Sequence, residues 1–256
     1  MNGIKIVGTG CGIPDQVITN GDLAQLVDTS DSWIVSRTGI RCRRRCGPEQ
    51  THGDLCLAAA REALESAGVR PEQLGACIVA TMTPDTLIPS AACRLQRDLG
   101  LPEDALCFDL NAACSGFVFA LHTMQCLLAS SARKFGLVVG ADVLSRVVDW
   151  TDRSTCVLFG DGAGAAVVES RPEWPAACTD VGVRGDERLL RLAGPATGAP
   201  MHVQMQGQEV FRFAVETVPA CMDRLLAKDV YKRQVYGHWA TWATGPPAFA
   251  KECCKT

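Results

Sequence analysis

The chain has 256 residues, of which 47% are hydrophobic and 21% are charged, a composition typical of an α/β protein with enough apolar residues for one large or two small domains. Its formal net charge of -3 excludes a general affinity for nucleic acid or for an anionic membrane surface. No segment approaches the roughly 20 apolar residues that span a bilayer, and the first residues lack the pattern of a secretory signal, so we expect a cytoplasmic protein.

Strands and helices are predicted to alternate along the first part of the chain. In chain order, the expected elements are a strand over 4–10, a helix over 53–69, a strand over 76–82, a short helix ending near Gly100, a strand over 105–110, a helix over 115–132 and a strand over 134–143. The strands are almost wholly apolar, which predicts a parallel sheet covered by helices on both faces. The helix over 115–132 is apolar nearly all round, so we expect it to be buried between layers.

The glycine-rich stretch over 156–170 is predicted to form two strand-like runs joined by a tight turn. Gly160, Gly162 and Ala165 fit a loose dinucleotide-binding pattern, but a strand rather than a helix is expected after them. A pyrophosphate would therefore find no helix N-terminus there. A nucleotide-binding α/β domain stays an alternative, which thermal stabilisation by NAD rather than by acyl-CoA would favour.

A second α/β unit is predicted to begin near residue 171. It has expected strands around 178–183, 188–194 and 201–206, and a helix over 208–227. Residues 231–256 differ in composition, because they hold both tyrosines of the chain and two of its five tryptophans. We interpret this last stretch as an unrelated tail, produced by a frame change, a joined fragment or a cloning scar, and leave it out of the fold prediction.

The fourteen cysteines are scattered, without a C-x-x-C repeat, and most are expected to be buried thiols. Cys114 stands in DLNAACSGFVFAL, where the helix over 115–132 is predicted to begin. The positive end of a helix dipole and its unpaired N–H groups favour a thiolate and can hold an oxyanion. Its small neighbours would let a substrate carbonyl approach. Spacing alone leaves two interpretations open, a nucleophile or one more buried cysteine.

Five stretches, in order and at matching separations, resemble the β-ketoacyl-acyl carrier protein synthase III family. They are VDTSDSWIVSRTGIRCRRR (27–45), IPSAACRLQRDLG (88–100), DLNAACSGFVFAL (109–121), VVGADVLSRVVDWTDRSTCVLFGDGAGAAVV (138–168) and MQGQEVFRFAV (205–215). The resemblance extends from residue 1 to about residue 228. It implies a thiolase-like layered αβαβα fold, in which the N-terminal half is complete and the C-terminal half incomplete.

The resemblance implies that Cys114 is the nucleophile of an acyltransferase that initiates fatty acid synthesis. In such an enzyme the cysteine takes a short acyl group from acyl-CoA as a thioester, and the acyl group then condenses with malonyl-acyl carrier protein with loss of CO2. Acyl-CoA is a substrate, so no cofactor and no metal are expected. The partners implied are the acyl carrier protein and a second copy of the chain in a homodimer.

The same resemblance implies a set of substrate-binding residues. Those implied for CoA are Thr29, Trp33, Arg37 and Arg153, and those implied for the acyl and pantetheine groups are Met205, Phe211 and Ile88. Trp33 would stack on the adenine and the arginines would flank the nucleotide. Ile88 would reach the acyl pocket of the dimer partner. Three of these residues have a structural alternative, namely half-buried packing for Trp33 and ordinary core for Met205 and Phe211.

The arginine run Arg41, Arg43, Arg44 and Arg45 has no assigned role. It is interpreted either as a solvated face or as a surface that meets the acidic carrier protein or the CoA phosphates.

One part of the family pattern is missing from the 256 residues. The family completes its site with a histidine in a His-Gln-Ala-Asn stretch and a later asparagine, and neither stretch occurs here. None of the four histidines, His52, His122, His202 and His238, fits that motif. We therefore expect a truncated chain with residues 1–170 as the N-terminal half, 171–230 as a partial C-terminal half and 231–256 as the tail. Such a chain would lack normal condensing activity and would expose apolar surface.

Two other functions stay open from the sequence. A related synthase, of the hydroxymethylglutaryl-CoA or secondary-metabolite type, shares the cysteine and the fold, although the entrance at Trp33 and Arg37 favours the synthase III type. A non-catalytic CoA-binding fragment is the other alternative.

Overall fold

The computed structural model describes residues 2–228, and these residues divide into two compact units. The first unit comprises residues up to 16, 44–146 and 160–177, and the second comprises residues 17–43, 147–159 and those from 178 onward. Each unit therefore takes segments from distant parts of the sequence. His238 and the predicted tail over 231–256 lie outside the described residues.

The first unit is built on a five-stranded sheet in the order β1-β7-β6-β4-β5. The strands are β1 (Gly3–Gly12), β4 (Leu74–Ala80), β5 (Leu106–Leu110), β6 (Phe135–Val143) and β7 (Asp161–Arg171). β4 runs parallel to β5 and β6, whereas β7 runs antiparallel to both β1 and β6. The prediction of a wholly parallel sheet was therefore wrong. Strand direction depends on how the strands are connected, and the connections carry no periodic signal.

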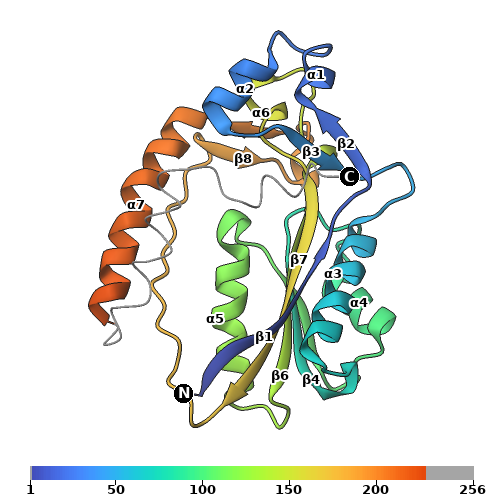
Figure 1. Cartoon of the computed structure of the whole chain (residues 1–256), viewed down its shortest axis with the longest axis vertical. Coiled ribbons are helices and arrows are strands. Elements are labelled where there is room, and N and C mark those ends of the chain that lie inside the picture. Colours follow the sequence, from blue (N-terminus) through green and yellow to red (C-terminus); the bar gives the residue numbers. More distant parts are fainter. Residues whose placement is uncertain (1, 229–256) are drawn as a thin grey trace. The chain divides into compact units, whose positions relative to one another are not determined.

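Helices cover both faces of this sheet, as predicted (Figure 1). Helices α3 (His52–Ala67) and α4 (Ala91–Leu99) pack on one face and α5 (Gly116–Leu128) packs on the other. The N-terminus of α3 is fixed by a capping box between Thr51 and Asp54, and the helix ends at Gly68 in the left-handed conformation. Gly100 ends α4 in the same way. Short 3₁₀ turns lie at η1 (Pro71–Gln73), η2 (Ala113–Ser115) and η3 (Leu144–Arg146).

Three glycines of β1 bring α3 close to the sheet. A Cβ atom at Gly8, Gly10 or Gly12 would collide with the backbone of α3, at Ala63, Ala59 and Leu55 respectively. These three residues alternate along β1 and lack side chains. The backbones of β1 and α3 can therefore pack directly against each other.

Helix α5 is buried on one side only. Gly116, Ala120, Met124 and Leu128, spaced four apart, are buried against the sheet, whereas Val118 is 51% exposed. The expectation that this helix is buried all round was therefore wrong for the described part of the chain.

The glycine-rich stretch over 156–170 does not form the predicted hairpin. Its first residues end the short helix α6 (Arg153–Cys156), and a single strand, β7, begins at Asp161. Tight hairpin turns require a positive φ at glycine. None of Gly160, Gly162 and Gly164 has one. The apolar run before these glycines contributes Cys156 and Val157 to a core, which explains why it resembles a strand in sequence.

The described part of the second unit combines short helices, a hairpin and one long helix. It holds α1 (Asn20–Leu23), α2 (Asp31–Thr38), α6, the antiparallel pair β8 (Leu190–Leu192) and β9 (Val203–Met205), η4 (Pro195–Thr197) and α7 (Gly207–Lys228). β2 (Gln16–Thr19) and β3 (Cys42–Arg45) pair as a two-stranded sheet. No strand forms over 178–183, contrary to prediction. The core of the unit is centred on Leu23, Ile34 and Val148.

Arg43 is a structural residue of the second unit. It is buried, and its guanidinium donates hydrogen bonds to Asn20 Oδ1, to the Ile18 carbonyl and to the Val157 carbonyl at 2.9–3.3 Å. Burial lowers the pKa of this arginine below its ordinary value. The interpretation of the whole arginine run as one solvated or ligand-binding face was therefore wrong at Arg43.

Replacing Arg43 with alanine is expected to lower the free energy of unfolding by about 2–4 kcal/mol, because buried oxygen acceptors lose a charged donor. Urea unfolding followed by circular dichroism measures this loss. Arg41→Ala, at an exposed position in the same run, is the matched control and should change the stability by less than about 0.5 kcal/mol. Equal effects of the two substitutions would contradict the assignment.

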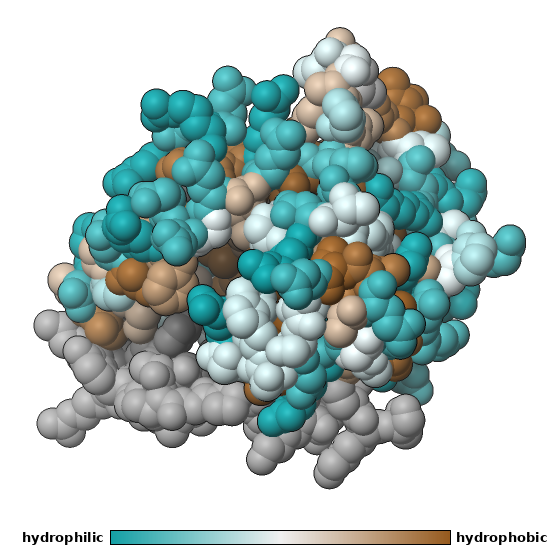
Figure 2. Space-filling view, turned by 90° about the horizontal axis from the view of Figure 1, so that it is seen from above, coloured by the Kyte–Doolittle hydropathy of each residue, from teal (hydrophilic) through white to brown (hydrophobic). Residues whose placement is uncertain are grey.

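Apolar residues also reach the surface. Figure 2 shows hydrophobic residues grouped among hydrophilic ones on the face that it presents. The most exposed large apolar side chains include Leu87, Ile88, Val183 and Phe211. Among the helices of residues 2–228, none is long and apolar enough to cross a membrane.

Candidate active site

Cys114 lies where the edge strand β5 gives way to helix α5. The chain leaves β5 at Leu110, forms the 3₁₀ turn η2 around Cys114 and enters α5 at Gly116. The cysteine is exposed, in contrast to Cys46, Cys56, Cys77 and Cys156, which are buried. The predicted position at a helix start is confirmed, and the first N–H groups of a helix provide the local positive potential that an oxyanion needs.

The backbone just before Cys114 is strained. Ala113 has a φ of +46°, in the left-handed region that residues with a Cβ atom rarely adopt. Such a conformation costs about 1–2 kcal/mol for an L-residue other than glycine. It turns the chain sharply between β5 and α5, so the side chain of Cys114 is presented at the surface. Nothing in the sequence signals this strain, because alanine is an ordinary residue for a turn into a helix.

Replacing Ala113 with glycine is expected to raise the free energy of unfolding by about 0.5–1 kcal/mol, because glycine adopts a positive φ without steric cost. Thermal unfolding measures the change. Ala112→Gly is the matched control, because Ala112 has a φ of -140° and glycine should destabilise the chain there. If Ala113→Gly is as destabilising as the control, the left-handed turn is absent in solution.

Within residues 2–228, no hydrogen bond joins the Cys114 thiol to a histidine. His52 is a core residue whose Nε2 lies 3.1 Å from the Ala141 carbonyl oxygen. His202 precedes β9, as predicted, and lies 3.8 Å from an Asp149 carboxylate oxygen. His122 is on α5, the helix that follows Cys114. The described chain therefore presents a cysteine without a histidine partner.

Two guanidinium groups lie over the ring of Trp33 in the second unit. The Arg37 guanidinium lies 4.8 Å from the centre of the Trp33 ring, and the Arg153 guanidinium lies 5.0 Å from it. Arg37 follows Trp33 by one turn of α2, whereas Arg153 comes from α6, far along the chain. An aromatic surface beside two fixed cations is an arrangement that suits a nucleotide with phosphate groups. Trp33 also packs partly against the core around Ile34, so it is a half-buried packing residue as well.

We define the cradle as Thr29, Trp33, Arg37 and Arg153. The Asp28 carbonyl and the Thr29 hydroxyl add polar groups to it. The Asp28 carbonyl accepts a 2.8 Å hydrogen bond from Arg153 and so fixes its side chain. The Thr29 hydroxyl is buried and has no hydrogen-bond partner among the described residues. A buried hydroxyl without a partner costs free energy, so a ligand group that pairs with it would gain affinity. The role of the Asp28 carbonyl was missed from the sequence, because a backbone oxygen leaves no signal in residue type.

The remaining predicted residues, Met205, Phe211 and Ile88, lie on other elements than the cradle. Met205 ends β9 and is half-buried, whereas Phe211 on α7 is 68% exposed. Phe211 is therefore not an ordinary core residue. Ile88 is 91% exposed on the loop before α4. Cys114 and Ile88 belong to the first unit, and the cradle, Met205 and Phe211 belong to the second.

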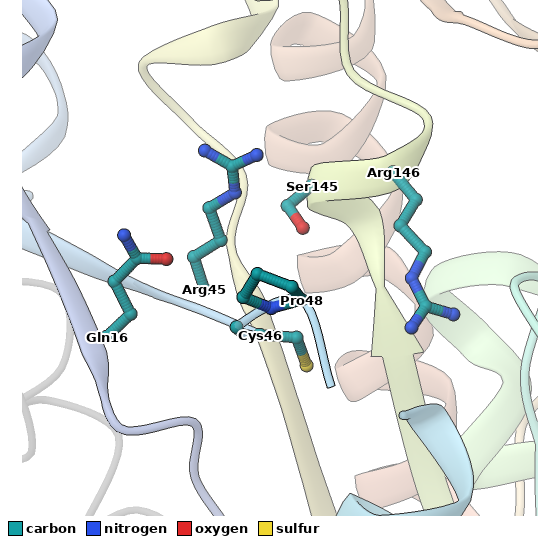
Figure 3. Close-up of a pocket in the computed structure, with 7 residues that line it drawn as sticks. Gln16, Arg45, Cys46, Pro48, Ser145 and Arg146 are labelled. Carbon is teal, nitrogen blue, oxygen red and sulfur yellow. The ribbon is translucent and has the colours of Figure 1, made fainter. Parts of the chain in front are cut away.

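A cavity of about 520 Å³ lies elsewhere in the first unit and is lined by Gln16, Arg45, Cys46, Gly47, Pro48, Ser145 and Arg146. Figure 3 shows Arg45 and Arg146 on opposite sides of Cys46 and Pro48. Asp161 accepts hydrogen bonds from Ser145 and from the Cys46 backbone beside it, and burial raises the pKa of the Cys46 thiol to about 11. None of the predicted catalytic or substrate-binding residues lines this cavity. Within residues 2–228, no group of three side chains is placed to hold a metal ion.

The sequence of the chain is similar to known proteins of one family. The family model for 3-oxoacyl-[acyl-carrier-protein] synthase III matches residues 108–185, which include Cys114 and Arg153. A β-ketoacyl-[acyl-carrier-protein] synthase III of Alkalilimnicola ehrlichii is 46% identical over 237 residues, which are 89% of this chain and 73% of that protein.

The chain belongs to the β-ketoacyl-acyl carrier protein synthase III family.

Solved structures agree with this assignment. The synthase III of Aquifex aeolicus superposes with a TM-score of 0.81 at 42% identity, over 88% of this chain and 72% of that one. A priming β-ketosynthase of the R1128 polyketide pathway superposes with a TM-score of 0.77 at 35% identity, over 85% of this chain and 68% of that one. The fold is therefore the thiolase-type α/β fold, and the chain is a condensing acyltransferase of the type that initiates fatty acid synthesis. Acyl-CoA and malonyl-acyl carrier protein are the substrates that this membership implies.

Proposed function

We propose that Cys114 of this synthase III takes a short acyl group from acyl-CoA while the cradle binds the nucleotide end of CoA. The observation that carries the proposal is the stacking of Arg37 and Arg153 on Trp33, in a chain whose one cysteine at the start of α5 is exposed. The Thr29 hydroxyl, buried and without a partner in the described chain, would pair with a polar atom of the same ligand.

The acyl transfer follows from the chemistry of the thiolate. The sulfur of Cys114 attacks the thioester carbonyl of acyl-CoA, and the carbonyl oxygen becomes an oxyanion next to the N-terminus of α5. Collapse of this tetrahedral species expels the CoA thiolate and leaves the acyl group on Cys114. Because one thioester replaces another of similar energy, the acyl group stays activated for carbon–carbon bond formation.

Condensation needs more than this chain supplies. In the full reaction malonyl-acyl carrier protein loses CO2, and the resulting enolate attacks the acyl-Cys114 carbonyl, releasing β-ketoacyl-acyl carrier protein and the free cysteine. Hydrogen-bond donors must stabilise that enolate. The 256 residues contain no His-Gln-Ala-Asn stretch to supply one. We infer that the polypeptide accepts an acyl group but does not extend it.

Assembly and organisation complete the proposal. A homodimer would bring the exposed Ile88 of one copy to the acyl pocket of the other, lined by Met205 and Phe211, and a cytoplasmic location would give access to both substrates. In terms of sequence, residues 1–170 would form the thiolase-like half with the nucleophile, residues 171–230 would begin the second half, and residues 231–256 would be unrelated to it.

Mass spectrometry of the purified chain tests the acyl transfer. After incubation with acetyl-CoA and removal of excess substrate, the intact protein should gain one acetyl group, and peptide mapping should place it on Cys114. Release of one equivalent of CoA thiol should accompany the gain. Protein that binds CoA but never becomes acylated would instead identify a non-catalytic CoA-binding fragment.

Replacing Trp33 with alanine is expected to weaken CoA binding about tenfold, which corresponds to ~1.4 kcal/mol, because the ring is the surface on which the adenine stacks. Isothermal titration calorimetry with CoA measures the change. Trp174→Ala is the matched control, since Trp174 carries Lys5 and Arg171 over its ring in the first unit. Unchanged affinity for the Trp33 variant, or an equal loss for both variants, would rule out the cradle.

A further inference from the structure

Four cysteines lie in or beside the layer between the sheet and the helices α3 and α4. Cys56 comes from α3, Cys77 from β4, Cys93 from α4 and Cys107 from β5. Cys56 and Cys77 belong to the buried core itself, and Cys107 packs against it from the edge strand. In the parallel pairing of β4 with β5, Cys77 and Cys107 are direct partners. The acyl transfer uses none of these thiols.

Only one pair among them combines proximity with access. Cys93 is exposed, and its thiol donates a 3.6 Å hydrogen bond to the carbonyl oxygen of Cys107. Cys107 is half-buried on the edge strand, and its side chain packs on the same side of the sheet as α4. The Cys93 sulfur therefore contacts the backbone of Cys107, and the charge of Cys93 acts on the Cys107 thiol, so the two thiols are neighbours, as the geometry of a disulfide requires.

The other two thiols are excluded by burial. Cys77 is 0% exposed and Cys56 is 1% exposed, so no oxidant reaches either of them from solvent. Burial also raises the pKa of Cys56 to about 12 and the pKa of Cys77 well above its ordinary value. Because the thiolate is the reactive form, both are inert.

We propose that Cys93 and Cys107 form a thiol–disulfide exchange site that reacts with low-molecular-weight disulfides such as glutathione disulfide. The exposed Cys93 thiolate attacks one sulfur of glutathione disulfide, and one glutathione thiolate leaves and takes up a proton. Cys107, as its thiolate, then attacks the Cys93 sulfur of this mixed disulfide and expels the second glutathione. The two protein thiols lose two electrons and two protons, and one glutathione disulfide is reduced to two glutathione thiols.

The second step is the slower one. Burial, followed by the charge of Cys93, raises the pKa of the Cys107 thiol to about 11, so little thiolate is present. Proximity offsets this deficit, because the attack within the mixed disulfide is intramolecular.

The cross-link would join the helix and the strand that lead to the nucleophile. The Asp109 carboxylate on β5 already accepts hydrogen bonds from the Ala91 and Ala92 backbone N–H groups at the start of α4, both at 2.8 Å. A disulfide between Cys93 and Cys107 adds a covalent tie along the same contact. Strand β5 runs directly into the turn that holds Cys114.

The experiment uses the full 256-residue chain and excess glutathione disulfide. After the reaction, free thiols are alkylated, the protein is digested, and fragmentation of the cross-linked peptides assigns each sulfur, which separates Cys93 from Cys77 on the same tryptic peptide. The expected result is a Cys93–Cys107 disulfide as the dominant cross-link, with the loss of two hydrogen atoms from the protein mass. Cys107→Ser should stop at a glutathione adduct on Cys93, and Cys93→Ser should give neither product.

Cys126→Ser is the matched control, since Cys126 is an exposed cysteine on α5, and it should leave the cross-link unchanged. When the chain is unfolded in guanidinium chloride, the same reaction should give disulfides between many different pairs of cysteines. A wild-type chain that stops at the Cys93 adduct, joins Cys93 to another cysteine, or shows no selectivity over the denatured sample would overturn the proposal. None of these readouts depends on acyl transfer.

Discussion

Replacing Cys114 with alanine is expected to abolish covalent acylation of the chain by acetyl-CoA, with a loss of at least about a thousandfold in the rate of CoA release, because no other group replaces a missing nucleophile. CoA binding should persist, since the cradle around Trp33 lies in the other unit and shares no residue with the turn at Cys114. Intact mass after incubation with acetyl-CoA, together with calorimetry for CoA, separates the two effects.

Cys126→Ala provides the matched control for this substitution. Cys126 is also an exposed cysteine associated with α5, but it lies near the end of that helix, far from its N–H groups. It should become acylated no more than background in any variant. If Cys114→Ala still gains an acetyl group to the wild-type extent, the nucleophile has been assigned to the wrong residue.

Malonyl-acyl carrier protein added to the acetylated chain is expected to yield no acetoacetyl product above the blank. Removing one enolate-stabilising or oxyanion-stabilising donor costs about a hundredfold to a thousandfold in rate. The family motif supplies two such side chains, and the His-Gln-Ala-Asn stretch that holds the histidine does not occur in the 256 residues. The acetyl group should therefore remain on Cys114 while the carrier protein keeps its malonyl group.

Mass spectrometry of both proteins measures this outcome. A full-length synthase III, such as that of Aquifex aeolicus, serves as the positive control for the carrier protein and the malonyl donor. Detectable acetoacetyl-acyl carrier protein from the 256-residue chain would mean that its own residues replace the missing donors. Failure of acetylation would contradict the nucleophile, whereas product formation would contradict only the block in condensation.

The elements with strong local signals could be predicted from the sequence. Helix α3 has an apolar stripe, a cap at Thr51 and a left-handed glycine at Gly68, and all three are local properties of the chain. Strand β4 is an unbroken apolar run, and each of its residues is buried. Here the burial pattern, the caps and the length point to the same element.

The errors arose where a distant contact decides the structure. Strand β7 inserts antiparallel between β1 and β6, and nothing in its own residues specifies that partner or direction. Arg43 has the composition of a solvated residue but donates hydrogen bonds to acceptors as far along the chain as Val157. Residue type gives no measure of such partners, since they come together only in the folded unit.

The candidate site divides in the same way. The position of Cys114 at a helix start follows from the change of pattern after DLNAAC, so the sequence predicted it. The φ of Ala113 and the unpaired hydroxyl of Thr29 are properties of the fold alone. The approach of Arg153 to Trp33 was expected only from family resemblance, because 120 residues separate them in the chain and no spacing rule joins them.

The glycines of β1 have a consequence for how mutational tolerance should be interpreted. Gly8, Gly10 and Gly12 touch no proposed substrate, yet even alanine at these positions would collide with the backbone of α3. A saturation mutagenesis screen should therefore find them as intolerant as Cys114. Such a screen alone would suggest a second active site on β1. Thermal unfolding of the variants would show that these substitutions impair folding rather than catalysis.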